Sequence, residues 1–186
     1  MNTHPTAPRF TADAFIEWAR EQPRGRYELA GGEVVAMAPE RAGHARVKLS
    51  AVNAVAASLK AANLPCEAMV DGMAVRIDEH TVYEPDVLVR CGARTPDDVV
   101  VISDPIILVE VVSPSSRAID SGAKLTGYFR LPSLRHYLVV NIDGRAVTHH
   151  QRCAAGDIAT RILRDGALVL DPPGATVAVA DFFAAL

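Results

Sequence analysis

A single carboxylate interrupts the most apolar stretch of this 186-residue chain. Residues 106–112 read Ile-Ile-Leu-Val-Glu-Val-Val, so Glu110 stands inside a run of large aliphatic side chains. A short run rich in β-branched residues predicts a strand that is buried on both faces. Because burial of an unpaired carboxylate is strongly unfavourable, Glu110 needs a cation, a hydrogen-bond donor or a proton beside it.

Further charged residues lie on the neighbouring predicted elements. Asp86 follows Pro85 and opens the apolar stretch 87–89, while Asp120 and Lys124 fall on a predicted helix at 117–130. Two acids that point inward from neighbouring strands, together with a lysine, are typical of a metal-dependent phosphodiesterase site.

Composition favours one α/β domain. With 49% hydrophobic residues, the chain can bury a substantial core. We expect a loose arm at residues 1–10 and a single domain at 11–186. No stretch is apolar enough to span a bilayer, and the first residues do not resemble a signal peptide, which together predict a cytoplasmic protein. Cys66, Cys91 and Cys153 are far apart and odd in number, so we expect unpaired thiols.

The net charge of −3 and the pI of about 6.1 are not typical of a dedicated DNA-binding domain. The distribution is less even than the total, because residues 117–164 contain 8 basic and 3 acidic side chains. This segment could form a modest basic face, and a solvated surface of arginines explains the same count equally well.

Hydrophobic periodicity and turn residues predict the order of the elements. The predicted helices are 11–21, 42–62 and 117–130. The predicted strands are 26–30, 33–37, 66–71, 73–77, 86–90, 106–112, 136–141, 146–151, 158–163 and 167–170, and residues 177–186 form a last strand or short helix. His149 and His150 alternate across one strand and are interpreted as structural.

The spacing between Glu110 and Lys124 predicts that they meet. A strand carries the chain about 13 Å from Glu110 to the turn near Pro114, and a helix returns it about 12 Å from Ser116 to Lys124. If the helix packs back along the strand, Lys124 lies level with Glu110. Simpler alternatives are a buried ion pair of Glu110 with Arg46 or Arg76, and an ordinary surface pair of Asp120 with Lys124.

These acids predict a site for a hard divalent ion such as Mg²⁺ or Mn²⁺. Asp86 and Glu110 would supply carboxylate oxygens, joined by the backbone carbonyl of Val111. Lys124 would orient the attacking water or stabilise the developing charge.

The chain resembles the PD-(D/E)XK nuclease superfamily and, within it, the Uma-type family of restriction endonuclease-like proteins. The resemblance covers about residues 27–183, and the residues that carry it are Tyr27-Glu-Leu, Gly32-Glu33, His44, Pro85-Asp86, Glu110-Val-Val-Ser-Pro114, Asp120, Lys124 and Tyr128. It implies a restriction endonuclease-like core of order α-β-β-β-α-β with a mixed central sheet, an N-terminal β-hairpin and C-terminal antiparallel strands.

The resemblance also implies roles for these residues. It makes Asp86 and Glu110 metal ligands and Lys124 the active-site lysine, with Asp120 beside it. It suggests Glu33 as an auxiliary acid and brings His44 toward the site. The superfamily name places a lysine two residues after the acid, where this chain has Val112. In the Uma-type pattern the lysine stands on the following helix instead.

Two functions of different classes follow from the sequence. The first is a Mg²⁺- or Mn²⁺-dependent endonuclease that acts on DNA, as a homodimer by the resemblance. The second is a catalytically inactive module that keeps the nuclease fold for dimerisation or for binding a partner. The acidic pI and Val112 in the usual lysine position favour this alternative.

Overall fold

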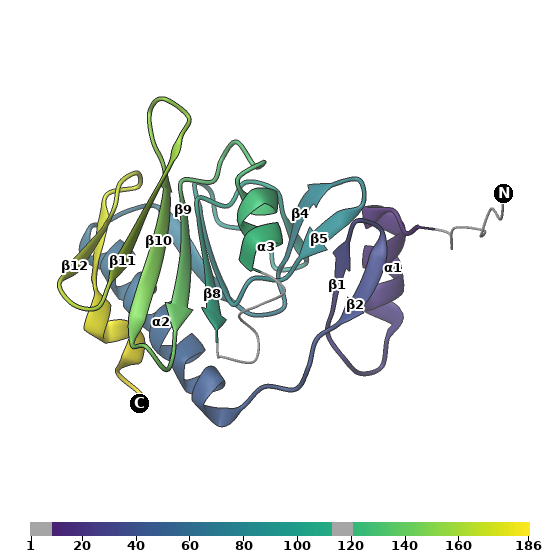
Figure 1. Ribbon diagram of the computed structural model, residues 1–186. Coiled ribbons are helices and arrows are strands. Elements are labelled where there is room, and N and C mark those ends of the chain that lie inside the picture. Colours follow the sequence, from purple (N-terminus) through teal and green to yellow (C-terminus); the bar gives the residue numbers. More distant parts are fainter. Residues whose placement is uncertain (1–8, 113–120) are drawn as a thin grey trace, which may run out of the picture.

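A six-stranded mixed sheet forms the centre of the computed structural model, which describes residues 9–112 and 121–186 (Figure 1). All neighbouring strands are antiparallel except β8 and β9, which run parallel. In spatial order the strands are β11 (Ile158–Leu163), β10 (Ala146–Arg152), β9 (His136–Asn141), β8 (Ile107–Val112), β6 (Val87–Cys91) and β3 (Cys66–Val70).

Helix α2 (Ala42–Ala61) covers one face of this sheet. Its buried residues recur every four positions, at Val47, Ala51, Val55 and Leu59, which gives the helix one continuous apolar stripe. The same core takes in the hairpin of β12 (Ala167–Leu170) and β13 (Ala175–Ala178) and the 3₁₀ helix η1 (Val179–Phe183). This core is the larger of the two that enclose the sheet.

Helix α3 (Ser121–Tyr128) packs on the opposite face (Figure 1). Successive residues of β8 show the division, because Ile107 and Val109 join the core under α2 whereas Leu108 joins the core under α3. Tyr128 and Tyr137 are the large buried side chains on the α3 side. Strand β8 is therefore covered on both faces, as its apolar sequence predicts.

A second sheet lies beside the first and has the order β2-β1-β5-β4-β7. Its strands are β2 (Glu33–Ala36), β1 (Tyr27–Ala30), β5 (Thr81–Tyr83), β4 (Ala74–Asp78) and β7 (Val101–Ile102). Helix α1 (Ala12–Glu21) packs on it through Phe15 and begins at Thr11, whose hydroxyl accepts a hydrogen bond of 3.3 Å from the Ala14 N–H.

The predicted fold class is confirmed. Elements α2, β3, β6, β8, α3 and β9 give the order α-β-β-β-α-β, with the β1–β2 hairpin before it and antiparallel strands after it. The helix predicted at 117–130 is present as α3, and its first predicted turn lies outside the described residues, as do residues 1–8 of the predicted arm. The short strands β5 and β7 were not predicted, because two or three residues carry no readable periodicity.

The prediction of unpaired cysteines is wrong for two of the three. Cys66 and Cys91 form a disulfide, and Cys153 is free. The two cysteines lie directly opposite each other in the antiparallel register of β3 and β6. Their separation of 25 residues hides this proximity, because the chain leaves the central sheet between them to form β4 and β5. Among the described residues, no helix is both long and apolar enough to cross a membrane.

Candidate functional site

Glu110 lies at the centre of a buried polar cluster between β8 and α3. The Lys124 ammonium lies 3.0 Å from Glu110 Oε1, and the Tyr128 hydroxyl donates to the same oxygen at 2.7 Å. The ammonium also donates at 2.9 Å to Glu28 Oε1, an oxygen that accepts a second hydrogen bond from the Glu84 N–H. Glu110 and Lys124 are only 9% and 3% exposed, so these contacts act in a region of low dielectric.

The close approach of α3 to β5 positions Lys124 in this cluster. A Cβ atom on Gly127 would lie 2.9 Å from a ring carbon of Tyr83, so only glycine permits this spacing without a shift of the helix or the ring. The Lys124 ammonium lies 5.6 Å from the centroid of the same ring. The predicted meeting of Lys124 with Glu110 is thus achieved by a helix that is held against both sheets.

Glu110 binds a proton far more readily than an ordinary carboxyl. Burial raises the pKa of Glu110 to about 8, against the opposing influence of the Lys124 ammonium and the Tyr128 hydroxyl. The negative charges of Asp86 and Glu28 add to the increase. Burial and the nearby carboxylates also raise the pKa of Tyr128. A cation that binds beside Glu110 would therefore displace this proton, because it stabilises the charged form of the carboxyl.

Asp86 lies directly before β6, where the pairing of Val87 with Val109 brings it beside Glu110 on the neighbouring strand. Its Oδ2 atom accepts a hydrogen bond of 2.7 Å from the Val111 N–H. Its Oδ1 atom lies 3.0 Å from the ammonium of Lys48, which comes from α2. Asp86 is 4% exposed, so both contacts fix the carboxylate within the protein.

His44 joins this side of the site from the first turn of α2. Its Nε2 atom lies 2.7 Å from the carbonyl oxygen of Val111 and 3.8 Å from Asp86 Oδ2. Its Nδ1 atom is buried, lies 3.5 Å from Glu40 Oε2 and forms no hydrogen bond within the described residues. His44 therefore lies beside two groups of the predicted ligand set, Asp86 and the Val111 carbonyl.

The donor atoms on this side fit a metal ion. Glu40, His44 and Asp86 each offer a ligand atom, and these atoms lie within 4.8 Å of one another. The predicted set of Asp86, Glu110 and the Val111 carbonyl shares Asp86 with this group, and His44 contacts the Val111 carbonyl. Carboxylate, carbonyl and imidazole donors are suited to a divalent cation.

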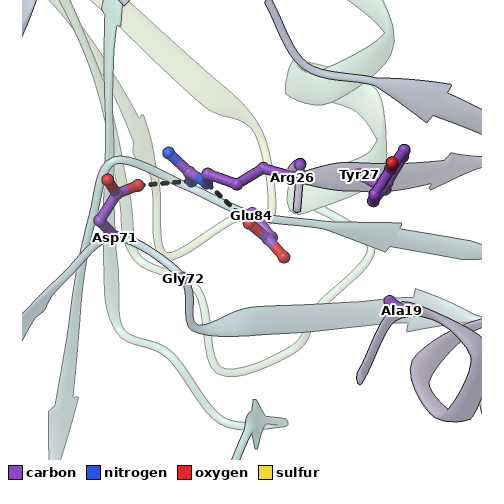
Figure 2. A pocket seen from close by; sticks show the side chains of 7 residues that line it. Ala19, Arg26, Tyr27, Asp71, Gly72 and Glu84 are labelled. Carbon is purple, nitrogen blue, oxygen red and sulfur yellow. Dashed lines mark hydrogen bonds and ion pairs between the residues drawn. The ribbon is translucent and has the colours of Figure 1, made fainter. Parts of the chain in front are cut away.

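A chain of ion pairs continues from the site into a surface cavity of about 350 Å³. Lys48 contacts Glu40 and lies 3.1 Å from Asp71 Oδ2. Arg26 contacts Asp71 and lies 3.2 Å from Glu84 Oε2; Figure 2 shows its guanidinium directed toward both acids. The cavity is lined by Ala19, Gly25, Arg26, Tyr27, Asp71, Gly72 and Glu84.

Two predicted site residues are not placed in this cluster. Glu33 is exposed at the first position of β2, and Asp120 lies outside the described residues. The alternative partners of Glu110 do not apply either, because Arg46 is exposed and Arg76 lies 2.7 Å from Asp13 Oδ1.

Sequence reasoning missed Glu28 and Lys48. Glu28 is buried on β1 and contacts Lys124, but a glutamate in a short hairpin strand is ordinarily exposed to solvent. Lys48 lies four residues after His44, one helical turn further along α2. The i,i+4 spacing could have predicted that Lys48 shares a helix face with His44. It predicts a place in the site only if His44 is itself assigned to the site.

The prediction that His149 and His150 are structural agrees with their positions. His149 is fully buried, and its Nε2 atom lies 2.9 Å from Nδ1 of His136 on β9. The Nε2 atom of His136 lies 2.8 Å from the carbonyl oxygen of Pro172. Burial lowers the pKa of His136 to about 4, and burial together with the proximity of His136 lowers that of His149 to about 3. Both rings are therefore neutral near pH 7.

Comparison with known proteins gives one family and a small set of relatives. Residues 12–180 match the Uma2 family, whose description is "Putative restriction endonuclease". Two uncharacterized proteins of Synechocystis sp., slr1290 and sll1609, are each 26% identical to the chain over 151 and 150 residues, which cover 81% and 79% of it and 78% and 83% of the relatives.

A solved structure shows the same fold. It is the crystal structure of an Anabaena variabilis protein described as a "putative nuclease belonging to DUF820". The TM-score is 0.74 at 13% sequence identity, and the match covers 94% of this chain and 98% of the other. The restriction endonuclease-like architecture is thus found in a protein whose sequence is only distantly related.

Proposed function

Because the chain belongs to the Uma2 family, we propose that it is a divalent-metal-dependent endonuclease that hydrolyses phosphodiester bonds of DNA. The observation that carries this proposal is the placement of Asp86, directly before β6, beside Glu110 on the adjoining strand β8, with Lys124 3.0 Å from Glu110. Burial of two acids and a lysine beside one another lowers the stability of the fold through the loss of their hydration. Metal-dependent phosphodiester hydrolysis gives each of these three groups a role.

The proposed ion is Mg²⁺ or Mn²⁺, held by Asp86, Glu110 and the backbone carbonyl of Val111. His44 lies near enough to Asp86 and to the Val111 carbonyl to orient both ligands. When bound, the ion would supply Lewis-acid polarisation of the phosphate and lower the pKa of a coordinated water.

The protein's own groups would orient the reactants and stabilise charge. The Val111 N–H fixes Asp86 through Oδ2, and the Tyr128 hydroxyl fixes Glu110 through Oε1. Lys124, anchored by Glu28 and Glu110, would direct a proton toward a phosphate oxygen and stabilise the negative charge that develops there. The contact with Glu28 keeps this ammonium in place when Glu110 binds the ion.

We also propose that the active species is a homodimer, since two copies would bring two such sites to a DNA duplex. Light scattering of the full chain, alone and with duplex DNA, tests this point separately from the chemistry. A mass of one chain under both conditions would contradict it.

Nicking of supercoiled plasmid DNA in Mg²⁺ or Mn²⁺ tests the proposed activity. Wild-type protein should nick the plasmid, and Asp86→Ala and Glu110→Ala should each lower the rate by at least about 100-fold. Addition of EDTA should abolish nicking by the wild type.

Asp97→Ala is the matched control, because Asp97 is an exposed acid outside the site that forms an ion pair of 2.9 Å with Arg94. It should nick at the wild-type rate. Equal nicking by wild type and by both site variants would assign the activity elsewhere. A folded wild type that never nicks DNA would favour the non-catalytic module that dimerises or binds a partner.

A further inference from the structure

Lys48 is a second buried lysine in the site, and three carboxylates surround its ammonium. The Nζ atom lies 3.0 Å from Asp86 Oδ1 and 3.1 Å from Asp71 Oδ2, and it also contacts Glu40 Oε1. Lys48 is 3% exposed although it belongs to a helix with an exposed side. An ammonium enclosed by carboxylate oxygens on several sides occupies the kind of environment that proteins otherwise build for a metal cation.

The three carboxylates converge from separate segments of the chain. Glu40 precedes α2, Asp71 follows β3, and Asp86 precedes β6. A backbone hydrogen bond of 3.1 Å from the Asp71 N–H to the Asp86 carbonyl oxygen holds the last two segments together. Lys48 meets all three because it lies one helical turn after His44, so both side chains leave α2 on the side that faces Asp86.

Asp86 itself is positioned to bridge two cations. Its Oδ1 atom faces Lys48, while its Oδ2 atom faces the Val111 N–H and the His44 ring. In two-metal phosphodiesterase sites, ions about 3.5–4 Å apart flank the reacting phosphate. Here one side of the carboxylate already faces a fixed positive charge supplied by the chain.

Acidic side chains outnumber basic side chains around the site. Among the residues that the structure describes, the connected network contains six acids, Glu28, Glu40, Asp71, Glu84, Asp86 and Glu110, and the three basic side chains Arg26, Lys48 and Lys124. One divalent ion would offset two of the three excess negative charges that remain when all six acids are ionised. Without Lys48, the Glu40, Asp71 and Asp86 carboxylates would face one another with one cation fewer between them.

We propose that the Lys48 ammonium takes the position of a second metal ion at Asp86, so that the site binds one divalent cation rather than two. The inference rests on the proposed function, because it assumes that Asp86 is a ligand of the first ion. Lys48 is then a positioning residue, which orients Asp86 and excludes a further metal ion from the oxygens of Glu40 and Asp71.

Counting bound Mn²⁺ on the full chain, by calorimetric titration and by the electron paramagnetic resonance of free Mn²⁺, tests this inference. Wild-type protein should bind one Mn²⁺ per chain at saturation. Lys48→Ala should bind two, because three carboxylates then surround an empty position. Lys48→Arg, which retains a positive charge there, should bind one.

Two further variants complete the design. Lys60→Ala removes an exposed lysine from the last turn of the same helix and should bind one ion. Adding Asp71→Asn to Lys48→Ala should return the count from two to one, because Asp71 contacts Lys48 and is outside the proposed ligand set of the first ion. If Lys48→Ala does not fold, Lys48→Ser, whose short side chain also leaves the position empty, carries the same expectation.

Each outcome decides the inference. Two ions on the wild type overturn it whatever the variants do, and a folded Lys48→Ala that still binds one ion overturns it as well. If that variant binds one ion while the wild type nicks DNA in an Asp86-dependent manner, the inference alone fails and the proposed function stands. A wild type that binds no Mn²⁺ contradicts both.

Discussion

The ammonium of Lys124 and the Oε1 atom of Glu110 lie 3.0 Å apart, and the contact joins the centre of β8 to α3. Both side chains are buried, and the same ammonium lies 2.9 Å from Glu28 Oε1, so two buried acids depend on this lysine. Removal of the lysine leaves Glu110 and Glu28 without their shared cation.

We therefore expect Lys124→Met to lower both activity and stability. Nicking should fall by at least about 100-fold, because the charge that develops on the phosphate loses its counter-ion. The free energy of unfolding should fall by about 3 kcal/mol, as for other buried pairs that lose one partner. Urea titration and plasmid nicking measure the two effects. Lys60→Met, at an exposed position of α2, should change neither. Full activity of Lys124→Met would contradict this role.

Tyr128→Phe should weaken the orientation of Glu110 while it preserves the core. The ring of Tyr128 packs edge-on against those of Tyr83 and Tyr137, so phenylalanine keeps these contacts. Loss of the hydroxyl donor should cost about 1–2 kcal/mol of stability and about 10-fold in nicking rate. Tyr27→Phe provides the comparison, because its hydroxyl donates to a backbone carbonyl in an exposed turn. Equal rates in the two variants would show that the Tyr128 hydroxyl does not act through Glu110.

Glu28 and Glu33 can be separated by matched substitutions. Glu28→Gln removes the second carboxylate that anchors Lys124, and we expect nicking to fall by about 10- to 100-fold. Glu33→Gln alters an exposed carboxylate on the paired strand β2, and its effect should be smaller. Initial nicking rates of the two variants under one set of conditions decide the order. A larger loss in Glu33→Gln would support the auxiliary role that the family resemblance suggests.

Reduction of the Cys66–Cys91 disulfide should destabilise the fold. A crosslink that closes a loop of 25 residues restricts the unfolded chain, and loss of that restriction costs about 3 kcal/mol. Thermal unfolding with and without dithiothreitol measures the change, and a Cys66→Ala/Cys91→Ala double variant should match the reduced protein. Cys153→Ala should keep the full difference between reduced and oxidised samples. Identical melting temperatures would show that the crosslink adds no stability.

The His136–His149 pair predicts a loss of stability in acid. Burial lowers the pKa of these histidines to about 4 and about 3, whereas an unfolded histidine titrates near about 6.5. Below that pH the unfolded chain binds more protons, so stability is complete above about pH 6.5 and is lost as pH falls toward the folded pKa values. Urea titrations from pH 7.5 to 4 should show a shallower decline in His149→Leu. An unchanged decline would place the acid sensitivity elsewhere.

The sequence was sufficient to predict the elements with strong local signals. The apolar stripe of α2 and the continuous apolar run of β8 locate the core, and helix and strand rise place Lys124 level with Glu110. Asp86 was expected near Glu110 because it opens the apolar stretch 87–89, which precedes the strand of Glu110, and the pairing of Val87 with Val109 agrees.

The remaining features depend on contacts that no local pattern encodes. Glu28 enters the site only because β1 pairs with β5, which brings it to the Glu84 N–H and to Lys124. Lys48 becomes part of the site because α2 packs on the central sheet with His44 and Lys48 directed toward Asp86. The disulfide depends on the antiparallel register of β3 and β6. Between these two strands the chain forms β4 and β5 of the second sheet, so the sequence does not show that the cysteines meet.

That disulfide also bears on the precision of the site. The edge strand β3 pairs with β6 in the central sheet, with Cys66 and Cys91 at one end of the pair and Asp71 and Asp86 just beyond the other. A slip of one residue along this strand pair would turn every side chain to the opposite face. The covalent bond prevents this slip. A crosslink that lies five residue pairs from Asp71 and Asp86 therefore fixes the strand register that directs both acids toward Lys48.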